Sequence, residues 1–171
     1  MDPLHINNQS IPSMSNVAAA AEPHRAFQVR IDDQPFEIRD PIVTGRQILD
    51  LAGKRPASEF VVLQYLPDGL LEDIRLEETT DLGESGVERF ITFETDRIFR
   101  FTLDEREFAW GAPRISGAKL KELAGVDPTK FDVWQEVRKS DDRLIADKDE
   151  ANLDEKGTER FFTAAKTTTE G

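Results

Sequence analysis

The sequence contains no cysteine among its 171 residues. This absence excludes a disulfide scaffold, a thiol nucleophile, a thioester-carrying enzyme and a cysteine-ligated zinc site. It is also what a reducing cytosol permits, so we expect a cytoplasmic protein. The two histidines, His5 and His24, both stand within the first 26 residues. We therefore expect neither a Ser-His-Asp triad nor a His-ligated metal in the folded part of the chain.

Basic residues and long apolar runs are also scarce. The chain has 22 Lys and Arg against 34 Asp and Glu, a formal net charge of −12. Phosphate binding needs a basic face, so we expect no nucleic-acid partner. In the first 26 residues the longest apolar run, Val17 to Ala21, is too short for a signal-peptide core or a membrane span. This segment is rich in Ser, Asn, Pro and Ala, and we predict a disordered arm that does not engage a membrane.

The sequence shows no glycine-rich phosphate loop, and its paired carboxylates occur only in polar stretches. The acidic runs Ser140 to Asp142 and Asp147 to Glu150 lack the spacing and the glycine of a calcium-binding EF-hand loop. We interpret them as solvated loops. The sequence therefore predicts no catalytic residue, no metal site and no cofactor, and we do not expect an enzyme.

The chain contains an internal duplication. When residues 27–56 are placed over residues 99–128, nine of thirty positions are identical, and residues 62–92 match residues 133–163 at ten of thirty-one. About four matches would be expected by chance from ordinary residue usage. A unit of about 70 residues exceeds the usual solenoid repeat and is long enough for a small domain. With only Arg97 and Ile98 between the copies, we expect a restricted relative orientation.

Each copy has the same order of local patterns. Two alternating runs flank an acidic turn ("FQVRI-DDQ-PFEI", "FRFTL-DER-EFAW"), which predicts a hairpin. A short helix follows ("TGRQILDLAG", "SGAKLKELAG"), with Thr44 and Ser116 as N-caps, a Thr44–Gln47 capping box, and Gly53 and Gly125 after the last turn. A third strand ("FVVLQY", "FDVWQE"), an irregular stretch and a last strand ("VERFITFE", "TERFFTAA") complete the unit. The predicted fold is α+β, a mixed sheet with one packed helix in each domain, whose last strand pairs parallel with the first.

Order, length, duplication and a tail ending in glycine together resemble the ubiquitin β-grasp fold. The tandem arrangement, with "TGRQILDLAG" and "ERFIT" recurring, resembles the bacterial multiubiquitin family over residues 27–171. Four segments follow: a disordered arm (1–26), a first ubiquitin-like domain (27–96), a second (97–166) and a flexible tail (167–171) that ends in the conjugation glycine.

The resemblance implies a protein modifier. Its working group would be the carboxylate of Gly171, which an adenylating enzyme of the ubiquitin-activating type activates with ATP and which is then joined to a target amine. It further implies a conjugating enzyme, a deconjugating metalloprotease and target proteins as partners, and some such families are linked to phage defence. Thr168, Thr169 and Glu170 would be read by the activating enzyme. The tail "TEG" departs from ubiquitin because it carries one glycine and no adjacent basic residue.

Charge and lysines are unevenly distributed between the copies. Residues 27–96 hold 7 basic and 16 acidic residues, net −9, and residues 97–167 hold 14 and 15, net −1. The acidic first domain either docks on a basic partner or is simply a solvated surface, and both readings stay open. Seven of eight lysines lie in the second copy. If the modifier forms chains, this copy is the expected acceptor, with Lys119, Lys121 and Lys130 as candidates.

Two other functions compete with the modifier. A β-grasp adaptor would bind a partner through a sheet face or edge and would never be conjugated. An acidic decoy would occupy a basic site, and its binding would depend strongly on salt.

Overall fold

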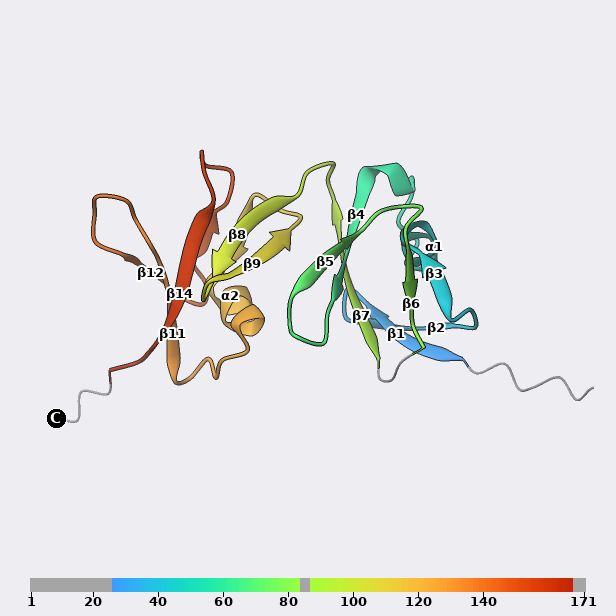
Figure 1. Ribbon diagram of the computed structural model, residues 1–171, viewed down its shortest axis with the longest axis horizontal. Coiled ribbons are helices and arrows are strands. Elements are labelled where there is room, and N and C mark those ends of the chain that lie inside the picture. The colour runs from blue at the N-terminus through green and yellow to red at the C-terminus, as the bar shows by residue number, and fades with distance from the viewer. Residues whose placement is uncertain (1–25, 84–86, 168–171) are drawn as a thin grey trace, which may run out of the picture.

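A computed structural model describes residues 26–83 and 87–167, which form two sheet-plus-helix domains (Figure 1). The remaining residues of the arm and tail, and residues 84–86, lie outside the described part. The elements of the first domain are β1 (Phe27–Ile31), β2 (Gln34–Ile38), β3 (Ile42–Thr44), α1 (Gly45–Leu51), η1 (Ala57–Glu59), β4 (Phe60–Tyr65), β5 (Leu71–Ile74), β6 (Thr79–Asp81) and β7 (Glu88–Glu94). Those of the second are β8 (Phe99–Leu103), β9 (Arg106–Trp110), β10 (Arg114–Ser116), α2 (Gly117–Ala124), β11 (Phe131–Gln135), β12 (Arg143–Ile145), β13 (Glu150–Asn152) and β14 (Glu159–Ala165).

Each domain is built on a five-stranded mixed sheet. The strand order is β2-β1-β7-β4-β5 in the first domain and, read in the same sense, β9-β8-β14-β11-β12 in the second. The first and last strands of each domain, β1 with β7 and β8 with β14, pair parallel, and the other pairs are antiparallel. The prediction of a mixed sheet with one helix and a parallel central pair is confirmed.

The stretch between the third and last strands was predicted to be irregular, and this is wrong. In the first domain this stretch contributes β5 to the main sheet, and its β6 pairs with β3. In the second domain β12 joins the main sheet, and β13 pairs with β10. These strands are only three or four residues long, too short for an alternating pattern to identify them. A tight turn at Gly69, where φ is +85°, returns the chain from β4 to β5.

Both helices are capped by the residues that the sequence predicts. The Thr44 side chain accepts a hydrogen bond from the backbone of Gln47, whose own side chain accepts one from the Thr44 N–H, so the predicted capping box is present. Ser116 caps α2 in the same way, by accepting from the backbone of Lys119. At the other end Gly53 and Gly125 have φ of +70° and +69°, the left-handed conformation that glycine adopts at least cost.

The duplication extends to individual hydrogen bonds. Asp32 accepts from the backbone N–H of Thr92 at 2.7 Å and from its hydroxyl at 2.6 Å. Asp104 accepts from Thr163 in the second domain at 2.7 and 2.9 Å. In each domain this aspartate stands in the first hairpin turn and ties it to the last strand. These charge-assisted hydrogen bonds replace water as the partner of the carboxylate, and they strengthen the attachment of the first strand to the last one.

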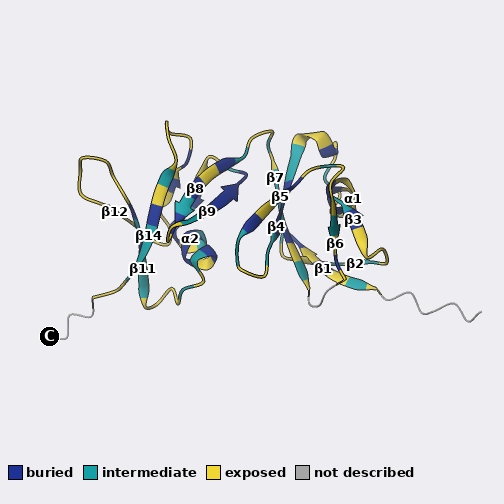
Figure 2. Cartoon of the chain, in the orientation of Figure 1, coloured by how far each residue is buried: buried dark blue, intermediate teal, exposed yellow. Residues whose placement is uncertain are grey.

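The two domains pack against each other over the outer face of the first sheet, the face opposite α1. The larger apolar core contains the interior of the second domain together with Leu63 and Leu71 of the first, and Tyr65, Ile91 and Phe93 pack against it. Figure 2 shows buried positions on β5 and β9, the strands that face each other across the boundary. This shared core agrees with the restricted orientation expected from the short connection.

Candidate functional site: the C-terminal end of the second domain

The last strand, β14, delivers the chain to the end of the fold. It pairs antiparallel with β11, and Phe131 stands opposite Ala165. One residue further on, the Lys166 N–H donates to the Lys130 carbonyl at 2.8 Å, and the Lys166 ammonium donates to the Pro128 carbonyl at 3.2 Å. The chain is therefore held to the sheet as far as Lys166. Gly171 and the predicted recognition residues Thr168, Thr169 and Glu170 lie outside the described residues.

This end of the second domain points away from the first domain. In Figure 1, β11, β12 and β14 lie on the far side of the second domain, whereas β8, β9 and α2 lie on the near side. A partner that approaches the base of the tail therefore meets the second domain alone.

A charged network stands beside the base of the tail. The Lys121 side chain is only 3% exposed, and its ammonium lies 2.7 Å from Asp147 and 3.7 Å from Asp132. The ammonium of Lys166 lies 3.8 Å from the same Asp132. The hydrogen bond from Lys121 lowers the pKa of Asp147 below its usual value. Two cations and two carboxylates thus connect α2, β11 and the loop after β12 to Lys166, the residue that follows β14.

Within the described residues of the first domain, 26–83 and 87–96, the corresponding positions form no such network. The counterparts of Lys121, Asp132 and Asp147 are the apolar residues Leu49, Val61 and Leu76. The backbone confirms this alignment, because Leu76 accepts from Arg46 as Asp147 accepts from Ala118. Sequence reasoning missed the network, although the aligned copies show three apolar positions replaced by charges.

The three candidate acceptor lysines stand in different environments. Lys121 is buried in the network just described, so its ammonium does not reach the surface. Lys119 lies at the domain boundary and donates to Glu122 at 2.6 Å. Burial lowers its pKa, but that bond and the nearby Tyr65 together raise it above the usual value. Lys130 is the accessible one, with 75% of its side chain exposed beside Asp127, 3.7 Å away.

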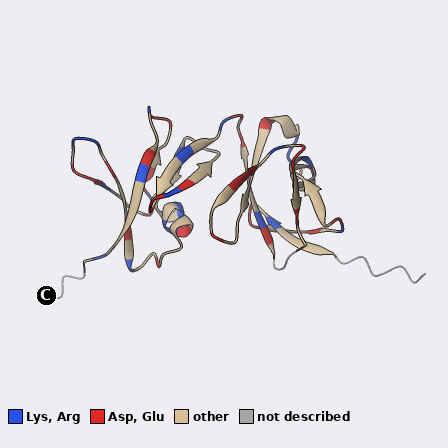
Figure 3. Ribbon diagram, in the orientation of Figure 1, with Lys and Arg blue, Asp and Glu red and all other residues tan. Residues whose placement is uncertain are grey.

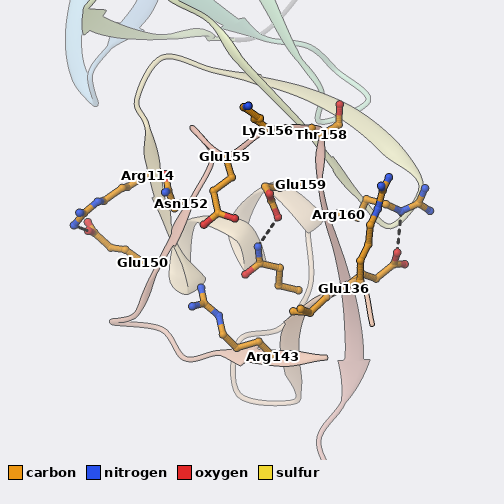
Figure 4. A pocket seen from close by; sticks show the side chains of 14 residues that line it. Arg114, Glu136, Arg143, Glu150, Asn152, Glu155, Lys156, Thr158, Glu159 and Arg160 are labelled. Atoms are coloured by element: carbon orange, nitrogen blue, oxygen red, sulfur yellow. Dashed lines mark hydrogen bonds and ion pairs between the residues drawn. The ribbon is translucent and has the colours of Figure 1, made fainter. Parts of the chain in front are cut away.

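A hollow of about 1000 Å³ lies at the opposite end of β14 from the tail. Figure 4 shows that its lining is polar, with Arg160 turned toward Glu136 and Arg114 toward Glu150. Gln135, buried in the sheet, donates to Glu159. Three of the four carboxylates that line this hollow, those of Glu136, Glu150 and Glu159, thus have a cation or an amide as partner.

Two further properties hold for the part of the chain that the structure describes. Within residues 26–83 and 87–167 no helix is long and apolar enough to cross a membrane. The same residues contain no group of three or more His, Cys, Asp and Glu side chains placed to hold a metal ion.

Comparison with known families gives a result that agrees with this geometry. The multiubiquitin family model matches the chain twice, over residues 27–95 and 99–166. The chain belongs to the multiubiquitin family. The two matches coincide with the two sheet-plus-helix domains, so each domain is a ubiquitin-like β-grasp unit. Among curated proteins no relative was found.

Proposed function

We propose that this multiubiquitin protein is a modifier, joined to target proteins through the carboxylate of Gly171. The observation that supports the proposal most directly is the way the chain leaves the second β-grasp domain. It is held at Lys166 by backbone and side-chain bonds, at an end that faces away from the first domain. From Thr167 the five tail residues reach at most about 17 Å when extended, far enough to enter another protein's active site.

The chemistry needs an activating enzyme that uses ATP. The Gly171 carboxylate attacks the α-phosphate of ATP, which gives an acyl adenylate and releases pyrophosphate. A nucleophile of the enzyme system displaces AMP, and an acceptor amine then displaces that nucleophile to form the amide. The modifier itself is a substrate rather than an enzyme. Glycine suits the reacting end because it has no side chain to obstruct a narrow channel, and Thr168, Thr169 and Glu170 supply the side chains that the channel reads.

The environment of the lysines favours Lys130 as an acceptor if chains form. Its ammonium is exposed, whereas Lys121 is buried and Lys119 is bonded to Glu122. Lys130 also accepts the Lys166 backbone bond through its carbonyl, so a modifier attached there would stand beside the base of the tail. A conjugating enzyme, a deconjugating metalloprotease and a cytoplasmic setting complete the proposal, with phage defence as its biological role.

The first test is intact mass after incubation with ATP and the activating and conjugating enzymes encoded beside the gene. The expected result is an adduct one water lighter than the sum of its parts. Deleting Gly171 or adding residues after it abolishes the adduct. An adduct that survives both changes contradicts a role for the Gly171 carboxylate, and no adduct with active enzymes favours an adaptor.

The acceptor is tested separately by peptide mapping of self-conjugates. Lys130→Arg, which keeps the charge but cannot form the amide, is expected to remove the linked peptide. The matched control is Lys54→Arg, because Lys54 is the first domain's single lysine. Linkage that persists at other positions in Lys130→Arg contradicts the assignment and leaves the modifier chemistry intact.

A further inference from the structure

The last strand of the second domain is followed by one more residue that stays bonded to the sheet. Lys166 comes directly after β14, and its backbone N–H donates to the Lys130 carbonyl at 2.8 Å, which continues the pairing of β14 with β11. At the corresponding point after β7, the Thr95 N–H turns back to the Phe93 carbonyl at 3.1 Å. The first domain thus bends the chain away at the position where the second domain holds it against the sheet.

The side chain of Lys166 is bonded at the same place. Its ammonium donates to the Pro128 carbonyl at 3.2 Å and lies 3.8 Å from the Asp132 carboxylate, and 38% of the side chain is exposed. Thr95 stands at this position in the first domain, and its hydroxyl instead accepts from the Arg97 N–H at 3.1 Å. Backbone and side-chain bonds together therefore hold the strand end in the second domain, the one that carries the tail.

The two acceptors of the Lys166 ammonium are themselves bonded to Lys121. The Lys121 ammonium lies 3.7 Å from Asp132 and donates to the Pro128 carbonyl at 3.5 Å, so the two lysines share both acceptors. Lys121 is 3% exposed and lies 2.7 Å from Asp147, and a close-packed side chain with such a partner has little freedom to move. It therefore fixes both acceptors in place. In Figure 3, positions of both charges lie close together at the end of the second domain from which the tail leaves.

This network is not needed to build a β-grasp domain. The first domain folds with three apolar residues, Leu49, Val61 and Leu76, at the corresponding positions. Charges that are taken out of water cost free energy that their mutual attraction does not always return, so a buried ion pair is weak evidence for a gain in stability. The network occurs in the domain that carries the tail, beside the residue that precedes the tail. Its place therefore indicates a role in the use of the tail.

We infer that Lys166 is a positioning residue for the activation of the Gly171 carboxylate, and that its ammonium does this by holding the end of β14 on the sheet. The inference rests on the proposed function. Residues 167–171 reach at most about 17 Å, so little length is spare when the strand end frays and the starting point of the tail shifts. Only molecules whose strand end is in place then bind productively, and the apparent affinity of the activating enzyme falls by that fraction. Lys166 acts through the backbone and takes no part in the chemistry.

The test is ATP–pyrophosphate exchange by the activating enzyme encoded beside the gene, measured over a range of concentrations of the full chain. Lys166→Met removes the ammonium from a side chain of similar length and is expected to raise KM about threefold or more, with kcat unchanged. Lys166→Arg keeps a cation within reach of the same two acceptors and is expected to restore most of the wild-type KM. Lys156→Met is the matched control, because Lys156 is an exposed lysine beside the hollow at the opposite end of β14. It is expected to leave KM unchanged.

Hydrogen exchange of single amides gives a second readout that needs no enzyme. The Lys166 N–H is bonded to the Lys130 carbonyl, so in Lys166→Met the amide of residue 166 is expected to exchange about threefold or more faster than in the wild type. The Thr163 N–H, bonded to Asp104 within β14, is expected to exchange at an unchanged rate. This difference separates a loosened strand end from a loss of stability of the whole domain.

Three outcomes would overturn the inference, and they are distinguishable. Unchanged exchange at residue 166 in Lys166→Met shows that the ammonium does not hold the strand end. Faster exchange with an unchanged KM shows that the position of the strand end does not matter for activation. Both leave the proposed modifier function intact, because the wild type is still activated. A wild type that active enzymes do not activate contradicts the proposed function itself, and this inference fails with it.

Discussion

Phe93 of the first domain and Trp110 of the second meet edge to face, with ring centroids 4.8 Å apart and an interplanar angle of 67°. The contact joins the last strand of one β-grasp unit to the first hairpin of the next. Trp110 is buried and donates its indole N–H to the Arg114 carbonyl at 3.1 Å, which fixes the ring in its own domain. Phe93 therefore packs on a ring that is held in place, and we expect the two domains to unfold together.

This coupling predicts the outcome of a double-mutant cycle. Phe93→Ala is expected to lower the free energy of unfolding by about 2–3 kcal/mol, somewhat less than for a fully buried phenylalanine. Gly111→Ala places a methyl group against the Phe93 ring and is expected to cost about 1–3 kcal/mol by overpacking. In the Phe93→Ala background that cost should fall but not disappear, because the ring is gone while the Cβ of residue 93, 2.6 Å from the added methyl group, remains. Urea denaturation of the four proteins measures the coupling, and additive losses would show that Gly111 is constrained by something else.

Tyr65 reports on the same boundary by its ionisation. It is the chain's single tyrosine, and burial raises its pKa above 10.0, with Lys119 opposing this and Glu122 adding to it. The Arg89 guanidinium stands 4.4 Å from the ring centroid. A raised phenol pKa means that the folded state favours the neutral form. Stability is therefore retained below the unfolded pKa of about 10 and falls as the pH rises through it.

Phenolate absorbance during an alkaline titration gives this pKa without ambiguity. Gly111→Arg, which introduces the first domain's Arg39 at this position, should push the domains apart and return the pKa toward about 10. Ile42→Ala is a suitable control, since Ile42 is 53% exposed on β3 of the first domain and does not line the hollow beside Tyr65. A wild-type pKa at or below the ordinary value would contradict the burial of Tyr65 between the domains.

The turn between β8 and β9 offers a stabilising substitution. Asp104 and Glu105 have φ of +49° and +66°, the left-handed conformation required at both central positions of a type I′ hairpin turn. Asp104 uses its carboxylate to bind Thr163 and must stay, whereas Glu105 makes no side-chain hydrogen bond within the described residues. Glu105→Gly is expected to raise the free energy of unfolding by about 0.5–1 kcal/mol by relieving this conformation.

Two comparisons separate backbone relief from other effects of changing Glu105. Glu105→Ala removes the same charge but keeps a Cβ, so thermal and urea unfolding should show no gain. Asp104→Gly should destabilise the protein despite its easier φ, because Thr163 loses a charged partner. Equal stabilisation by Glu105→Ala and Glu105→Gly would point to charge rather than to backbone conformation.

The sequence predicts elements where one local signal dominates. The hairpin, the capping box at Thr44 and the helix stripe all depend on residues within a few positions of one another. The core shared by the two domains depends on residues that are far apart in the sequence. The sequence indicates it only through the composition of one strand. The run from Phe60 to Tyr65 lacks a polar face, because Leu63 as well as Val62 is apolar, and a strand of this composition is covered on both sides. The sequence pattern alone does not identify the neighbouring domain as the element that covers the outer face of this strand.

The candidate site likewise has a part that the sequence predicts and a part that it does not. That the tail follows a last strand ending near Lys166 could be predicted, because "TERFFTAA" aligns with "VERFITFE". The environments of the lysines could not, since α2 is short and the depth of each side chain depends on the strands packed beneath it. Lys121 occupies the position of the buried Leu49, and a lysine is seldom buried without a partner. Its two aspartate partners come from β11 and from the loop after β12, segments that only the folded chain brings together.

The Lys121 network yields a prediction in which one change destabilises the protein and three together do not. Asp147→Leu alone leaves the buried Lys121 ammonium with the more distant Asp132, at 3.7 Å, and is expected to lower the free energy of unfolding. The triple variant Lys121→Leu, Asp132→Val and Asp147→Leu installs the first domain's Leu49, Val61 and Leu76. The triple variant removes the buried ammonium together with both of its carboxylate partners, so no buried charge is left without a partner and the variant should recover most of the loss.

The pH dependence supplies a second, independent readout of the network. The pKa of Asp147 is lowered in the folded state, so its stabilisation is complete above the unfolded value of about 3.9 and is lost as the pH falls through the folded value. Below pH 4 the wild type should therefore lose stability more steeply than the triple variant, and near pH 7 the two should be similar. Urea denaturation from pH 7 to pH 3 gives both slopes. Parallel curves would mean that Asp147 contributes no charge interaction and that Lys121 is held by the Pro128 carbonyl, 3.5 Å from its ammonium.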